Sequence, residues 1–95
     1  MEKTKSCIDD YKLEYWIGTL GSIPVKEIAH GDYSQSYEMD RMMVYELENG
    51  KYATILEVGC SCYDSADAQI DLFPTKKAAM TSFEAYEKDR KSMGY

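Results

Sequence analysis

Residues 39–58 read MDRMMVYELENGKYATILEV, and in this stretch two apolar, tyrosine-containing segments flank Asn49 and Gly50. The dipeptide Asn-Gly favours the left-handed backbone angles of a two-residue type I′ turn, which joins two antiparallel strands. The stretch therefore predicts a β-hairpin with strands at residues 39–47 and 52–58.

A two-residue turn also fixes the strand register, because it pairs Glu48 with Lys51 and Leu47 with Tyr52. Side-chain alternation then defines the face that we predict to form the core, which carries Met43, Tyr45, Leu47, Tyr52, Leu56 and Val58. The opposite face would carry the acidic residues of the hairpin beside smaller apolar ones, namely Met42, Val44, Ala53, Ile55, Glu46, Glu48 and Glu57.

The segments outside the hairpin predict further elements. Apolar residues at steps of three and four predict a helix over residues 8–20, and Pro24 suits the first turn of a short helix over residues 24–29. Residues 31–38 and 59–68 are expected to be loops, and residues 69–73 a third strand that ends before Pro74. Thr75 can cap a long final helix. We expect four aromatic side chains of the helices in the core: Tyr11, Tyr15, Trp16 and Tyr86.

The fold class predicted from these elements is α+β. The 95 residues form one small domain, residues 1–95, with N-terminal helices, a three-stranded, mostly antiparallel sheet centred on the type I′ hairpin, and a long C-terminal helix packed on the sheet. Such a chain is long enough to fold alone or as a small homo-oligomer.

The charge of the chain is uneven. The net charge of the chain is −6, and the segment between Asp32 and Asp71 alone carries −7, from nine acidic and two basic side chains. Five tyrosines also occur in this segment. An acidic, tyrosine-rich surface suits a basic protein partner, which it attracts over a distance and holds through ring contacts. The isoelectric point near 4.7 disfavours direct binding to nucleic acid or to an anionic membrane.

The sequence also bears on location. Apolar runs are only a few residues long, far short of the roughly 20 that cross a bilayer, and the first residues are polar. We therefore expect a cytoplasmic protein.

Nine residues are the candidates for partner binding, because they are the acidic and tyrosine side chains of the hairpin and of the adjoining loops. They are Tyr33, Tyr37, Glu38, Asp40, Glu46, Glu48, Tyr63, Asp64 and Asp67. The alternative for the tyrosines is packing over the sheet edge, and for the carboxylates it is a solvated surface.

Two motifs in the second half of the chain carry a resemblance, Gly59-Cys60-Ser61-Cys62-Tyr63 and Leu72-Phe73-Pro74-Thr75-Lys76-Lys77-Ala78-Ala79. Through them the chain resembles small uncharacterised proteins encoded in bacteriophage genomes. Small acidic phage proteins of this size include inhibitors of host defence, which occupy a surface or sequester a ligand. The resemblance thus implies non-enzymatic inhibition in the host cytoplasm, and it assigns no functional residue.

No catalytic or metal signature is found in the sequence. Cys60 and Cys62 are separated by one residue, whereas paired zinc ligands usually have two between them, and only Cys7 and His30 could complete a site of four. We expect no metal, no disulfide and no cofactor, with the thiols reduced. A single histidine also leaves only one imidazole base for a cysteine nucleophile.

The sequence favours a non-enzymatic protein whose acidic surface occupies a basic site on a host protein, including imitation of nucleic acid at a nucleic-acid-binding site. The alternative is a protein that sequesters a small nucleotide signal, with tyrosines stacking on bases and Lys76 and Lys77 holding phosphate at a helix N-terminus. A cysteine- or metal-dependent enzyme is the third class.

Overall fold

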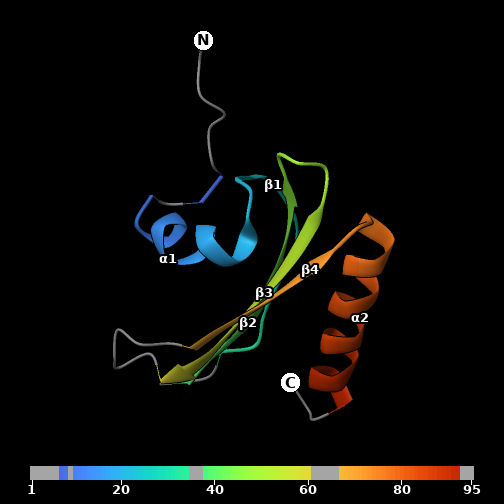
Figure 1. The fold of residues 1–95 in the computed structure, drawn as a ribbon. Helices are drawn as coiled ribbons and strands as arrows, with labels where there is room; N and C mark the ends of the chain where they lie inside the picture. Colours follow the sequence, from blue (N-terminus) through green and yellow to red (C-terminus); the bar gives the residue numbers. More distant parts are fainter. Residues whose placement is uncertain (1–6, 9, 35–37, 61–66, 93–95) are drawn as a thin grey trace.

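The protein folds into two helices and one four-stranded antiparallel sheet (Figure 1). The computed structural model describes residues 7–8, 10–34, 38–60 and 67–92. The elements in chain order are α1 (Asp10–Leu20), β1 (Pro24–Asp32), β2 (Glu38–Leu47), β3 (Tyr52–Cys60), β4 (Asp67–Phe73) and α2 (Lys76–Ser92). The strands lie side by side in the same order, β1-β2-β3-β4. The predicted α+β fold is confirmed, and the sheet has four strands rather than three.

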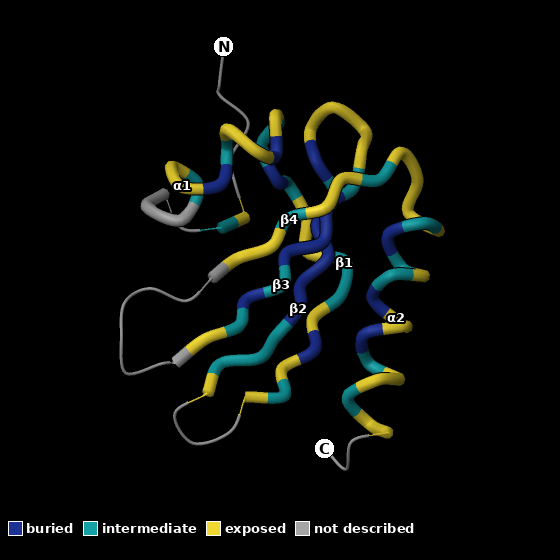
Figure 2. Tube along the Cα trace, turned by 60° about the horizontal axis from the view of Figure 1, so that its bottom comes forward, coloured by how far each residue is buried: buried dark blue, intermediate teal, exposed yellow. Residues whose placement is uncertain are grey.

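The sheet has a helix on each side. Helix α2 runs along one face, while α1 lies across the other face near the turn between β2 and β3 (Figure 1). The cluster on the α1 side consists of Trp16, Leu20, Met43, Tyr45, Leu47, Ala53 and Ile55. The cluster on the α2 side consists of Met42, Val44, Ala79, Phe83 and Tyr86. Figure 2 shows the buried residues concentrated in the central strands and on the side of α2 that faces them.

The hairpin between β2 and β3 is confirmed, but its predicted register is wrong by one residue. The amide of Leu47 donates to the carbonyl of Lys51 at 2.8 Å, so that Glu48, Asn49 and Gly50 all belong to the loop. Gly50 has φ of +85°, as expected for the left-handed residue that ends a three-residue loop. The loop length, which the Asn-Gly pair alone does not define, therefore decides the pairing.

The one-residue shift moves the side chains of β3 to the opposite face from the predicted one. Met43 pairs with Ile55 and Tyr45 with Ala53, and these four side chains are buried on the α1 side. Tyr52 and Leu56, predicted to share a face with Met43, contact the cluster on the α2 side instead. Because the side-chain period is two, a slip of one residue exchanges the faces completely.

The predicted short helix over residues 24–29 is wrong, because this segment is the start of strand β1. The pairing of β1 with β2 shifts twice, between Pro24 and Lys26 and between Glu27 and Ala29. These irregularities remove the simple alternation by which a strand is found in a sequence. Proline is tolerated here because Pro24 is the first residue of an edge strand. The predicted loop over residues 31–38 is correspondingly shorter, as β1 extends to Asp32 and β2 begins at Glu38.

The two helices agree with the prediction in most respects. Helix α2 begins after Thr75, whose hydroxyl accepts a hydrogen bond from the amide of Ala78 at 3.2 Å. Phe83 packs close to Gly31, where an added Cβ would lie 3.3 Å from its ring, so glycine permits the close approach of α2 to β1. In α1, Trp16 is buried as predicted, but Tyr15 is 82% exposed, and its predicted place in the core is wrong.

Strand β3 extends to Cys60 and β4 begins at Asp67, so the loop predicted over residues 59–68 is shorter than expected.

A search of the described residues for a helix long and apolar enough to cross a membrane finds none.

Gly50 offers a test of the turn. A Cβ at this position would meet no atom within 4 Å, so any cost of substitution arises from the positive φ alone. We expect Gly50→Val to lower the free energy of unfolding by about 1 kcal/mol or more, measured by chemical denaturation, because β-branched residues resist positive φ. Gly50→Asn is the control and should cost less, since asparagine tolerates this conformation. Equal stability of the valine variant and the wild type would contradict the turn geometry.

Candidate functional site

The acidic residues proposed from the sequence do not form one surface. Glu48 is exposed in the loop between β2 and β3, whereas Glu38 is exposed at the opposite end of β2. At about 3.4 Å for each residue of an antiparallel strand, these two carboxylates are separated by roughly 30 Å. Glu46 lies between them, and its carboxylate accepts a hydrogen bond from the hydroxyl of Tyr52 at 3.2 Å. Glu38 and Glu48 therefore belong to separate regions of the surface.

Asp40 is engaged within the molecule. Its carboxylate accepts hydrogen bonds from the hydroxyl of Tyr86 at 2.9 Å and from Nε of Arg90 at 2.6 Å, and its side chain is only 18% exposed. The guanidinium of Arg90 also lies 4.7 Å from the centre of the Tyr86 ring. These contacts hold α2 against β2, so Asp40 has a structural role.

Tyr33 also contacts α2. Its hydroxyl donates to Glu87 at 2.9 Å, and its ring meets that of Tyr86 edge to face at 5.7 Å. Of the remaining candidates, Tyr37, Tyr63 and Asp64 lie outside the described residues. Asp67 pairs with Val58 at the start of β4, and its side chain is not among those described.

A different group of charged side chains meets on the sheet face opposite α2. Register and alternation place Glu27, Asp32 and Glu57 there with Arg41 and His30. We call this surface, defined by these five residues, the acidic face. Among the described elements, α1 is the only helix on that side of the sheet, and it lies near the turn end (Figure 1). The prediction missed this surface because it took the segment that carries Glu27 for a helix.

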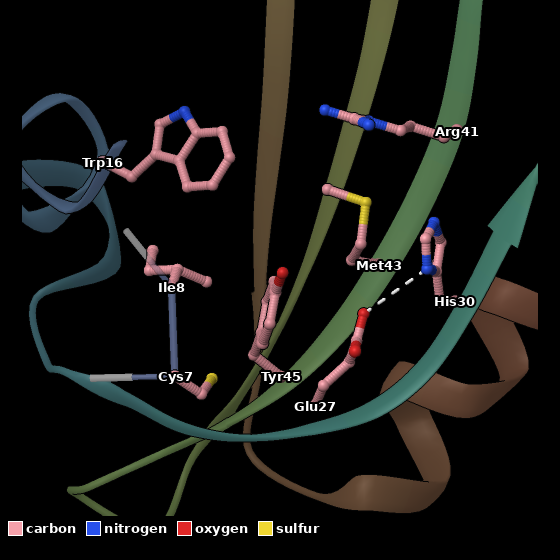
Figure 3. Close-up of a pocket in the computed structure, with 8 residues that line it drawn as sticks. All are labelled: Cys7, Ile8, Trp16, Glu27, His30, Arg41, Met43 and Tyr45. Carbon is pink, nitrogen blue, oxygen red and sulfur yellow. Dashed lines mark ion pairs between the residues drawn. The ribbon is translucent and has the colours of Figure 1, made fainter. Parts of the chain in front are cut away.

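A pocket of about 200 Å³ opens between α1 and the acidic face (Figure 3). The N-terminal segment forms one wall, and its position is fixed by a hydrogen bond of 3.0 Å from the amide of Cys7 to the carbonyl of Pro24. The residues that line the pocket are Cys7, Ile8, Trp16, Glu27, His30, Arg41, Met43 and Tyr45.

The cation of the pocket is already paired. Arg41 donates from Nε to Oε1 of Glu57 at 3.1 Å, and its Nη2 lies 3.0 Å from the same oxygen. Glu57 is buried, with 8% of its side chain exposed, so the pairing offsets the cost of removing this carboxylate from water. The positive charge of Arg41 is thus balanced within the protein.

Two further carboxylates of the acidic face reach solvent. Glu27 Oε1 lies 3.6 Å from Nδ1 of His30, and nearly half of each side chain is exposed. Asp32 accepts a hydrogen bond from the amide of Ser34 at 2.9 Å, and its hydrogen bonds with Ser34 hold its pKa below the usual value. The acidic face carries three carboxylates against the guanidinium of Arg41 and the imidazole of His30, so acidic groups outnumber basic ones there.

Two ionisable groups of the pocket have raised pKa values. Burial, followed by the negative charge of Glu27, raises the pKa of the Tyr45 hydroxyl. Burial is also the main cause that raises the pKa of the Cys7 thiol, and the charge of Glu27 adds to it. Cys7 is therefore a neutral thiol at physiological pH, which is the opposite of what a cysteine nucleophile needs.

Of the four soft metal ligands considered from the sequence, Cys62 lies outside the described residues, and the other three do not converge. Cys7 and His30 line the same pocket, but Cys60 pairs with Glu38 near the far end of the sheet, whereas His30 pairs with Met43. Five residues of β2 separate those positions, a distance of about 17 Å. Among the described residues, no group of three or more histidine, cysteine or acidic side chains could hold a metal ion.

Comparison with known proteins adds no identification: the chain matches no protein-family model, no curated protein and no solved structure.

The contact between Arg90 and Asp40 yields a stability prediction. We expect Arg90→Met to lower the free energy of unfolding by about 2 kcal/mol, because it leaves a mostly buried carboxylate with one hydrogen-bond partner fewer. Lys91→Met, on an exposed neighbour in the same helix, is the matched control and should change stability by less than about 0.5 kcal/mol. Equal effects in thermal or chemical denaturation would show that the ion pair does not hold α2 in place.

Proposed function

We propose that this protein is a non-enzymatic binding protein that uses the acidic face to occupy a basic surface on another protein. The observation that supports this most directly is the group of Glu27, Asp32 and Glu57 beside the pocket, on a side of the sheet that α1 covers only near the turn. A basic partner can neutralise Glu27 and Asp32, which reach solvent and remain hydrated until it arrives.

The distribution of charge over the fold supports the same proposal. Helix α2 contains five basic and three acidic side chains, which gives it a net charge of +2. Because the net charge of the chain is −6, the remainder carries −8. The helix lies on the face opposite the acidic face, so its cations do not shield it at close range (Figure 1).

The class of partner follows from the charge and from the resemblance of the second half of the chain to phage-encoded proteins. A site that binds nucleic acid is built of lysine and arginine, and carboxylates on adjacent strands can stand in for phosphates there. We therefore propose a host protein with such a site as the partner, and inhibition by occupation of that site as the effect.

A nucleotide-sequestering function has less support in the geometry. Lys76 and Lys77 are exposed at the start of α2, whereas the pocket lies on the opposite side of the sheet. Inside the pocket the guanidinium of Arg41 is paired with Glu57, and the carboxylate of Glu27 would repel phosphate. Stabilisation by nucleotides in a thermal-shift assay would nevertheless favour this alternative, and stabilisation by zinc would favour a metal-dependent activity.

Charge reversal tests the proposed surface. We expect Glu27→Lys combined with Asp32→Lys to slow association with an oligoarginine peptide by about tenfold at low salt, because steering depends on local potential. The association rate constant of the peptide is measured with the protein immobilised on a surface. The matched control combines Asp71→Lys and Glu84→Lys, which makes the same change in net charge at two exposed positions away from the acidic face.

Folding of both double variants is checked by thermal unfolding. A smaller effect of the control than of the acidic-face variant supports the proposed surface. Equal slowing by both would mean that only net charge matters, and oligoarginine binding that ignores salt would contradict the electrostatic proposal.

A further inference from the structure

The pocket beside the acidic face has the properties of a site for one cationic side chain. Its volume of about 200 Å³ matches roughly seven water molecules at about 30 Å³ each. Sites for drug-sized ligands usually span about 300–1,000 Å³, so a whole nucleotide would not be enclosed. A guanidinium or ammonium group with part of its aliphatic chain would fill the space.

The walls combine aromatic, apolar and anionic groups. Trp16 contributes an indole and Met43 a thioether, and the carboxylate of Glu27 points toward the ring of His30 (Figure 3). Aromatic faces attract cations, and this attraction grows when the cation is removed from water. The planar guanidinium is more weakly hydrated than an ammonium group and stacks on aromatic rings, so these walls favour arginine over lysine.

Tyr45 contributes a hydrogen-bonding group to the pocket. The residue is 7% exposed, and its hydroxyl lies inside the pocket (Figure 3). The phenolic oxygen can accept a hydrogen bond from a guanidinium N–H that enters the pocket.

We propose that this pocket receives the side chain of one arginine of the partner, with its guanidinium paired to Glu27 and in contact with Tyr45 and Trp16. The inference rests on the proposed function, because it specifies which group of the basic surface the acidic face takes up. Arg41 does not prevent this, since Glu57 balances its charge, and Glu27, which contacts His30 at 3.6 Å, is the carboxylate among the residues that line the pocket.

The test uses N-acetylarginine methylamide as a probe, titrated into isotope-labelled protein and followed by NMR. We expect the probe to shift the indole N–H signal of Trp16 and the backbone signals of Glu27 and Tyr45. Glu27→Gln should weaken the affinity by about tenfold, because it removes a charge-assisted hydrogen bond without changing the shape of the side chain. Asp71→Asn makes the same change of charge on an exposed residue outside the pocket and should weaken the affinity less than about twofold.

Other outcomes would overturn the inference. Equal loss of affinity in the two variants would show that the probe responds to overall charge, and shifts at α2 alone would place it elsewhere. Tighter binding of adenosine monophosphate than of the arginine probe would indicate an anion site. If oligoarginine binds the acidic face but the single-arginine probe does not enter the pocket, the pocket proposal fails and the proposed function stands. If neither binds, both fail.

Discussion

The structure depends on the burial of both faces of strand β2. Its side chains Met42, Met43, Val44 and Tyr45 follow one another in the sequence, and all four are buried. Burying an apolar side chain of this size contributes roughly 2 kcal/mol, while a domain is stable by only about 5–15 kcal/mol. The sheet therefore needs cover on both sides, α1 with the N-terminal segment on one and α2 on the other.

The same constraint explains where the two sides differ. Helix α2 follows the sheet along its length and is held by Asp40, Tyr86 and Arg90, whereas α1 is short and contributes Trp16 and Leu20 to the cluster on its side. The part of the face beyond α1 carries charged side chains instead of an apolar core. The pocket lies at the boundary between the two regions, so the apolar and the anionic groups meet there.

Sequence patterns predicted the elements whose signals are local. The hairpin followed from Asn49 and Gly50, and α2 from Thr75 and its apolar stripe, because turn chemistry and capping depend on neighbouring residues. The pairing register of β2 and β3 could not be predicted in the same way, because one extra loop residue exchanges the two faces of β3. Strand β1 was missed because its two register shifts hide the alternation, and Pro24 equally suits a helix start.

The candidate site was less predictable than the fold. Its walls come from the N-terminal segment, α1, β1 and β2, and nothing in the spacing of Cys7, Trp16, Glu27 and Tyr45 shows that they converge. Acid content indicated a basic partner, but it could not show that Asp40 is bound to Arg90 or that Glu57 is bound to Arg41. Only the arrangement in space separates carboxylates that hold the fold together from those that are exposed.

Helix α2 has a net charge of +2, whereas the acidic face has three carboxylates and the guanidinium of Arg41, and the two lie on opposite sides of a thin sheet. Together they contribute a dipole moment directed across the sheet. In the field of a positively charged partner, the dipole exerts a torque that turns α2 away and the acidic face inward before any atoms touch. Orientation would then precede contact, and the separation at which it begins would shrink with the Debye length, which is about 8 Å at physiological ionic strength.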